Sequence, residues 1–322
     1  MAIIEPRQQL LASRQLQISC VVPVHNEEGA IVDFINALKK QLQDLNDNFE
    51  IIIVDDGSKD NTLPKIITLL DQHIKLIALS RNFGQENALV AGMEHSSGDV
   101  VILIDADFQH PIELIPTFLQ HWINDYDIVY GIRQNREQES FVKRFLTHGF
   151  YRFLGKISRI DIPPNAGYFR LLDRKAVDAL NTLQERSRFL RGLSSWIGFK
   201  SIGIPFKVKQ RTTGRSSWSF YRLTELALTG ITSFSDIPLR VWSLVGFVVA
   251  GIAFAYGLYI VTKTLIFGVD TPGFATIIVA IMFFGGIQIF SIGVLGEYIA
   301  RIFNEVKRRP NYIIAKKFGF DD

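Results

Sequence analysis

The chain opens with short apolar runs that alternate with amphipathic segments. The runs of strand length are Ile18–Val24, Glu50–Val54, Lys75–Leu79 and Val100–Ile104. Segments with the apolar spacing of a helix lie between them, at Glu28–Leu42, Asn61–Leu70 and Gln85–His95. Strands that alternate with helices are typical of a parallel sheet with helices on its faces. The pattern therefore predicts an α/β fold, in which ligands bind at the carboxyl ends of the strands.

The pattern changes near Pro238, where charged residues almost disappear. Val241–Thr262 is an uncharged run of 22 residues, and Thr271–Gly296 is one of 26. A helix needs about 20 apolar residues to cross the hydrocarbon core of a bilayer. One such run alone also fits a buried core helix. Two runs separated by only eight residues favour a transmembrane hairpin, with helices over about 238–262 and 274–300.

Basic residues beside these runs predict the orientation of the hairpin. Arg240 precedes the first run, and Arg301 and Lys307–Arg309 follow the second. Flanks rich in Lys and Arg stay on the cytoplasmic side. We therefore expect an integral protein of the cytoplasmic membrane, with the α/β domain and both termini in the cytoplasm. The start, Met1–Leu16, lacks the apolar core of a signal peptide, which agrees with this orientation.

Two further segments have the composition of helices that lie in a membrane interface. Phe141–Ile157 is basic and rich in aromatic residues, and Trp218–Phe234 leads into the first apolar run. Ordinary core-facing helices are the alternative. The expected organisation is an α/β domain over 1–212, a juxtamembrane helix over 213–236, the hairpin over 237–302 and a cytoplasmic tail over 303–322.

Composition adds two constraints. The net charge of +3 is too small to indicate a nucleic-acid partner by itself, and membrane lipid is the surface that the hairpin predicts. Cys20 is the one cysteine, so an intrachain disulfide is excluded.

Two carboxylates follow the apolar run that ends at Ile104. Asp105 and Asp107 stand at positions i and i+2, which face the same side of an extended chain, and Gln109 comes two residues later. Hard divalent cations take oxygen ligands, often one or two carboxylates together with phosphate oxygens. A solvated turn at the strand end is the alternative.

Polar motifs also follow the other three predicted strands. Their candidate binding residues are Pro23, His25 and Glu27 after the first strand, Asp55 and Asp56 after the second, and Arg81 and Gln85 after the third. Each motif alone also fits a turn or a helix cap. Together they converge on one edge of the predicted sheet, where a binding site is expected.

In this order and spacing, the motifs VVPVHNEE, VDDGS, LSRNFGQE, IDADFQHP and GIRQ resemble the family 2 glycosyltransferases. The similarity is strongest to the branch that glycosylates polyisoprenyl phosphates, which includes dolichyl-phosphate mannose synthases and bacterial enzymes that glucosylate undecaprenyl phosphate. It continues through GYFRLLDRKAV, RFLRGLSSWIGF and LGEYIARIFNEVKRRP, and so covers nearly the whole chain.

The resemblance implies a GT-A (Rossmann-like) fold and an inverting transfer, and it assigns roles to matching residues. The nucleotide would be held by Pro23, His25, Glu27 and Asp55. The other strand-end residues predicted to bind the nucleotide-sugar are Asp56, Arg81, Gln85 and Asp105. A Mg²⁺ or Mn²⁺ ion and the diphosphate would lie at Asp105, Asp107 and Gln109. The catalytic set would be Asp107 with three arginines. Arg133 and Arg144 match arginines that face the donor and acceptor phosphates, and Arg211 matches a basic residue near the acceptor site. The fork of a guanidinium suits phosphate.

The resemblance also implies the partners of the reaction. The donor would be a UDP-sugar, with UDP-glucose preferred, and the acceptor would be undecaprenyl phosphate. Similar proteins form tetramers, and the glycines of the two apolar runs permit close helix packing in a homo-oligomer.

Two positions depart from the family pattern. Tyr168 stands where related bacterial enzymes often have an aspartate suggested as a base, and Ser217 stands where they have a lysine. A tyrosine with its usual pKa of about 10 is a poor base at neutral pH. A phosphate monoester, with a second pKa of about 6, is already ionised and needs placement more than deprotonation.

Two other functions compete with lipid-phosphate glycosylation. One is a membrane enzyme that polymerises a polysaccharide, but such enzymes usually carry a Gln-x-x-Arg-Trp motif and more spans, and neither is found in this sequence. The other is a non-catalytic relative bound to the membrane, supported only by Tyr168 and Ser217.

Overall fold

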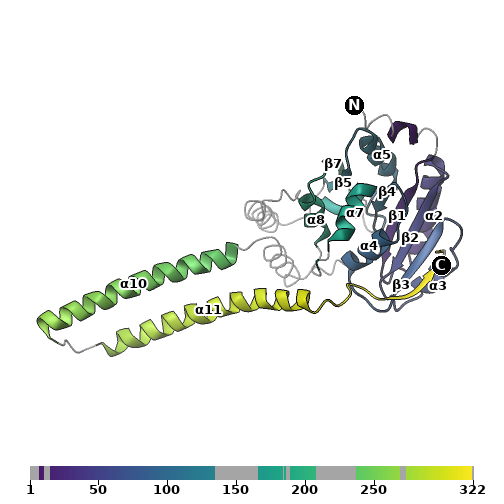
Figure 1. Ribbon diagram of the computed structural model, residues 1–322. Helices are drawn as coiled ribbons and strands as arrows, with labels where there is room; N and C mark the ends of the chain where they lie inside the picture. The colour runs from purple at the N-terminus through teal and green to yellow at the C-terminus, as the bar shows by residue number, and fades with distance from the viewer. Residues whose placement is uncertain are drawn as a thin grey trace. The chain divides into compact units, whose positions relative to one another are not determined.

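The computed structural model describes residues 7–10, 15–134, 166–183, 185, 189–207, 237–268 and 273–320. The chain divides into two units. One comprises Met1–Leu223 with Arg309–Asp322, and the other comprises Thr224–Arg308. The first unit is an α/β domain and the second is a helical hairpin (Figure 1).

The α/β domain is built on one sheet of eight strands. In chain order the strands are β1 (Ile18–Val24), β2 (Phe49–Asp55), β3 (Ile74–Leu79), β4 (Val100–Leu103), β5 (Ile128–Arg133), β6 (Ala166–Asp173), β7 (Ser201–Phe206) and β8 (Ile314–Phe318). Their order across the sheet is β7-β5-β6-β4-β1-β2-β3-β8. Strands β4, β1, β2 and β3 run parallel, and β6 is antiparallel to both of its neighbours.

The four predicted strands are confirmed with small changes at their ends. Every residue of β1, β2 and β4 is buried, which explains their continuous apolar runs. β2 and β4 lie on opposite sides of β1, so the direction in which strands are added reverses at β1. Such a reversal opens a crevice at the carboxyl ends of the two strands.

Helices cover both faces of this sheet. They are α2 (Ile31–Leu45), α3 (Thr62–Ile67), α4 (Gln85–Glu94), the 3₁₀ turn η1 (Ile112–Leu114), α5 (Ile115–Ile123), α7 (Arg174–Thr182) and α8 (Leu190–Trp196). Phe34 of α2 and Phe118 of α5 join the same core as Cys20 and Val22 of β1. α4 lies against the opposite face, where Gly92 approaches Val21 so closely that a Cβ would lie 2.2 Å from a Val21 methyl carbon. The three helices predicted between the strands correspond to α2, α3 and α4.

The C-terminal residues differ from the tail that the sequence suggested. β8 pairs antiparallel with β3 at the edge of the sheet, and the Ser80 amide donates to the Ile313 carbonyl at 2.9 Å. Figure 1 draws β8 in yellow beside β3. Lys316 and Lys317 interrupt the apolar pattern of this short strand. Charged residues are usual on edge strands, so the pattern did not predict it.

The hairpin consists of α10 (Ile237–Phe267) and α11 (Phe274–Val306). Stretches of 27 and 28 residues within them, Val241–Phe267 and Val279–Val306, are long and apolar enough to cross a membrane. Large apolar side chains such as Phe247 and Leu265 are about four-fifths exposed, at 79% and 81%. Trp242 and Phe290 pack together across the hairpin with ring centroids 4.9 Å apart. Exposed apolar helices of this length are typical of membrane-spanning segments.

The predicted interfacial helices, Phe141–Ile157 and Trp218–Phe234, lie outside the described residues, as do Arg144 and Arg211.

Candidate functional site

Hydrogen bonds join the loops that follow β1, β2, β3 and β4. His25 Nδ1 lies 2.9 Å from the carbonyl oxygen of Asp56. The Asp56 carboxylate accepts from the amides of Phe83 and Gly84 at 2.6 and 2.9 Å. Gln85 then donates to Asp105 Oδ1 at 2.5 Å. The polar motifs of four strand ends therefore form one connected group, which we call the strand-end cluster: His25, Asp56, Phe83, Gly84, Gln85 and Asp105.

Asp55 and Asp56 are both buried, at 2% and 3% exposure, but they have different surroundings. Both carboxylate oxygens of Asp56 are engaged by the loop after β3, so this residue orders that loop. The Asp55 carboxylate accepts from the Ser58 amide at 3.3 and 3.4 Å. Burial raises the pKa of Asp55, and the Ser58 bonds oppose that shift.

Gly57 brings the loops after β2 and β3 into contact. Its φ of +65° lies in the left-handed region, and a Cβ there would lie 2.4 Å from the carbonyl carbon of Arg81. Arg81 itself is exposed, with its guanidinium 4.1 Å from the ring centroid of Phe83. A glycine is therefore required where the two loops meet.

The remaining predicted nucleotide-sugar residues lie at the end of β1. Pro23 is buried within the strand and is paired with Val54 of β2. The Glu27 amide donates to Thr62 Oγ1 at 2.8 Å, so the loop after β1 is fixed to the start of α3. Both residues thus stand at the predicted edge of the sheet.

Asp105 and Asp107 follow β4, and both are partly exposed. Asp107 Oδ1 accepts from the Gln109 amide at 3.0 Å. Phe108, between Asp107 and Gln109, has a positive φ of 56°. Its ring packs edge-on against Phe34, with the ring centroids 5.2 Å apart. The backbone therefore turns sharply directly after Asp107, and the aromatic contact holds the turn.

These carboxylates suit a divalent cation that also binds phosphate. The described part of the chain contains no group of three or more His, Cys, Asp and Glu side chains able to hold a metal. Mg²⁺ is usually bound by one or two carboxylates plus substrate phosphates and water. Asp105 and Asp107, with the amide oxygen of Gln109, are a donor set of that kind.

His110, which is not among the predicted site residues, connects this turn with Arg133. Arg133 Nη2 lies 3.3 Å from His110 Nε2, and His110 Nδ1 lies 3.7 Å from Asp105 Oδ2. A guanidinium only donates, so Nε2 accepts and the imidazole proton is on Nδ1, facing Asp105. Burial and the Arg133 charge lower the pKa of His110 to about 4, so the ring is neutral at neutral pH. In the sequence, the position of His110 directly after Gln109 is the feature that could have marked it as a site residue.

A second polar group surrounds Glu86 at the start of α4. The Tyr168 hydroxyl donates to Glu86 Oε1 at 2.6 Å, and the Leu190 amide donates to Glu86 Oε2 at 3.2 Å. The Arg191 guanidinium lies 4.5 Å from the ring centroid of Tyr168. Burial and Glu86 raise the pKa of Tyr168 above its usual value, so the hydroxyl stays protonated and acts as a donor. We call Glu86, Tyr168, Leu190 and Arg191 the Glu86 cluster.

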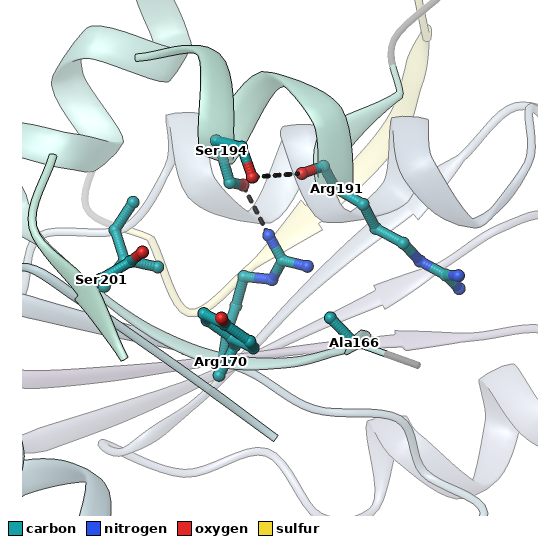
Figure 2. A pocket seen from close by; sticks show the side chains of 8 residues that line it. Ala166, Arg170, Arg191, Ser194 and Ser201 are labelled. Atoms are coloured by element: carbon teal, nitrogen blue, oxygen red, sulfur yellow. Dashed lines mark hydrogen bonds between the residues drawn. The ribbon is translucent and has the colours of Figure 1, made fainter. Parts of the chain in front are cut away.

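Arg170 lies behind this cluster in a small pocket that Arg191 and Ser194 also line. Its guanidinium donates to Ser194 Oγ at 2.6 Å and to the Gly167 carbonyl at 2.8 Å. Figure 2 shows Arg170 directed toward Ser194, whereas Arg191 extends away from Ser201. Burial lowers the pKa of Arg170 to about 10, which still leaves it charged at neutral pH.

The chain is similar to known glycosyltransferases over nearly its whole length. Residues 19–180 match the model of glycosyl transferase family 2, and residues 237–302 match the GtrB C-terminal hairpin. A Synechocystis protein described as an uncharacterized glycosyltransferase is 43% identical over 95% of this chain and 97% of its own length. A prophage-derived bactoprenol glucosyl transferase of Shigella flexneri is 43% identical over 94% of this chain and 98% of its own. A prophage bactoprenol glucosyl transferase homolog of Escherichia coli is 41% identical over 94% and 99%.

Proposed function

The chain belongs to glycosyltransferase family 2, and on that premise we propose that it moves a hexose from a UDP-sugar to a polyisoprenyl phosphate at the cytoplasmic face of a membrane. Glucose is the preferred sugar and undecaprenyl phosphate the preferred acceptor. The similarity to bactoprenol glucosyl transferases supports both, because it spans the α/β domain and the hairpin alike.

One observation carries the proposal. The chain combines a connected polar site at the strand reversal of an α/β sheet with a hairpin of two membrane-length helices. The strand-end position suits the nucleotide part of a donor. A membrane hairpin suits an enzyme whose acceptor is itself confined to the bilayer. The basic residues Lys307–Arg309 after the second helix favour a cytoplasmic domain.

Asp105, Asp107 and Gln109 would hold Mg²⁺ or Mn²⁺ beside the diphosphate. When bound, the cation supplies positive charge that stabilises the leaving diphosphate. Gln85 restrains Asp105, and Phe108 orients the turn that carries Asp107. Pro23, His25, Glu27, Asp55, Asp56 and Arg81 would form the binding surface for the nucleotide.

The transfer would be a single displacement with inversion. An oxygen of the lipid phosphate attacks the anomeric carbon, a new C–O bond forms, and the bond from that carbon to the diphosphate breaks. The phosphate is already ionised, so no base is required. Arg133, oriented by neutral His110, would bind a phosphate group. The family resemblance assigns the same task to Arg144 and places Arg211 near the acceptor.

A lipid-product assay tests this function. Membranes that contain the protein are incubated with radiolabelled UDP-glucose and Mg²⁺, then extracted with organic solvent. We expect label in an acid-labile lipid, and loss of that label when the metal is chelated. Label in an insoluble polymer would instead indicate a polymerising enzyme. Nucleotide binding without turnover of any nucleotide-sugar tested would indicate a non-catalytic relative.

A further inference from the structure

The carboxylate of Glu86 joins three elements that are distant in the sequence. It belongs to the first turn of α4, and its two oxygens accept from the Tyr168 hydroxyl of β6 and from the Leu190 amide at the start of α8. These partners lie 82 and 104 residues away along the chain. An acidic residue in a first helical turn often only complements the helix dipole. Two long-range bonds go beyond that local role.

Gln85, the residue before Glu86, contacts the turn after β4. Gln85 donates to Asp105 Oδ1 at 2.5 Å, so consecutive residues of α4 contact the metal-binding turn and the Glu86 cluster. Underneath, β4 and β6 are neighbouring strands, with Leu103 paired to Arg170. The start of α4 is therefore a bridge across two paired strands.

Charge explains why a carboxylate stands at this point. The pKa of Glu86 is raised by burial, and the Tyr168 hydroxyl, the Leu190 amide and the charges of Arg191 and Arg170 offset only part of that rise. Arg191 also lies over the Tyr168 ring at 4.5 Å. Removing the negative charge would leave two nearby guanidinium groups less compensated, and would release the tyrosine against which one of them is stacked.

We propose that Glu86 is a positioning residue for sugar transfer, which holds Tyr168 and Arg191 at a fixed place relative to the donor site at Asp105. This inference rests on the proposed function, and it assigns to the Glu86 cluster the side of the site that receives the acceptor. Glu86 acts through Tyr168 and Arg191 and does not touch the reacting atoms. The Tyr168 proton is committed to Glu86, so Tyr168 orients the site and is not a base.

The test compares Glu86→Gln, Tyr168→Phe and the double variant in the full-length protein in detergent with undecaprenyl phosphate. We expect kcat to fall about 10-fold to 100-fold in each single variant, because small misplacements of reacting groups have effects of that size. The kcat of the double variant should be no lower than that of the less active single variant, since both substitutions disturb the same contact between Glu86 and Tyr168. The Kd for UDP in the presence of Mn²⁺ should stay within about 2-fold of wild type, because donor residues are untouched.

α4 offers a matched control at its other end. Glu94, its last residue, accepts a hydrogen bond from the Tyr312 hydroxyl, so it forms the same Glu–Tyr pair away from the site. Glu94→Gln and Tyr312→Phe should leave kcat within about 2-fold of wild type. Any change in Tm common to both pairs then measures the structural part of the effect.

Three results would overturn the inference. The first is a wild-type kcat in both Glu86→Gln and Tyr168→Phe. The second is a lowered Tm in these variants with no change in kcat. The third is a double variant in which the losses of kcat from the two single variants add. If Glu86→Gln does not fold, Tyr168→Phe, which removes only a hydroxyl, decides the question alone. Failure of wild-type protein to glycosylate the lipid phosphate would overturn the proposed function as well. An active wild type with unaffected variants would overturn only the role of Glu86.

Discussion

In the strand-end cluster, side chains come from four loops that follow parallel strands next to one another in the sheet. In the Glu86 cluster they come from α4, β6 and α8, which meet only after the whole domain has folded. The first cluster is anchored largely by backbone amides, as when Asp56 binds the loop at Phe83 and Gly84. The second depends on one carboxylate beside two guanidinium groups. The strand-end cluster therefore depends mainly on backbone positions that the sheet sets, whereas the Glu86 cluster depends on a few side chains.

The largest expected effect tests whether the turn after β4, next to the strand-end cluster, carries the metal. Asp107→Ala removes one of two carboxylates after β4, and we expect kcat/KM to fall at least about 10³-fold, which corresponds to ~4 kcal/mol of transition-state stabilisation. The check is the lipid-product assay over a range of Mn²⁺ concentrations. Asp99→Ala is the control, because Asp99 accepts from the Gln17 amide at the opposite end of the strand. Full activity in Asp107→Ala would reject the metal assignment.

The same comparison explains what could be predicted from the sequence. Strands β1, β2 and β4 are buried on both faces, so their apolar runs and their ends, with Asp55 and Asp105, could be located from the sequence. β8 carries two lysines and depends on pairing with β3, so no local pattern marks it. Glu86 resembles any acidic residue in a first helical turn until Tyr168 and Leu190 are brought to it. Local periodicity predicts elements, whereas partners 82 or 104 residues away require the fold.

His110 links the turn after β4 to Arg133, and its titration gives the next largest effect. Its pKa is lowered to about 4 in the fold from the ordinary 6.5, so above pH 6.5 the ring is neutral in both states. Below that pH the unfolded chain binds a proton that the folded chain does not, and stability is lost as pH falls toward 4. The loss should be on the order of 3 kcal/mol.

Thermal unfolding of metal-free protein between these pH values measures the effect. The informative quantity is the difference between wild type and His110→Leu, since carboxyl groups that titrate in the same range contribute to both. His110→Leu should show a smaller decrease in Tm with acidification than wild type does. Equal pH dependence in the two proteins would show that His110 is not held neutral by burial.

A smaller effect is expected where two loops of the strand-end cluster touch. Gly57→Ala places a Cβ 2.4 Å from the Arg81 carbonyl carbon, at a φ of +65°. We expect a loss of more than about 1 kcal/mol in the free energy of unfolding, with weaker binding of UDP. Gly29→Ala is the matched control, since nothing lies within 4 Å of its Cβ position. The Kd for UDP of the two variants is compared by calorimetric titration in the presence of Mn²⁺. Equal Kd values would contradict the importance of the close contact between Gly57 and Arg81 for binding.

The smallest expected effect on the site concerns β8, which belongs to neither cluster and should act mainly on the stability of the domain. A chain that ends at Asn311 loses the antiparallel pairing with β3, including the bond from the Ser80 amide to Ile313, and also the contact of Phe320 with His95. A few hydrogen bonds at an edge contribute about 1 kcal/mol each, so Tm should fall by several degrees while the chain still folds. Because Ser80 begins the loop that carries Arg81 and leads to Gln85 at the start of α4, the KM for the nucleotide-sugar should rise more than the KM for the lipid phosphate. Equal changes in both KM values would mean that β8 stabilises the domain as a whole, with no particular connection to the strand-end cluster.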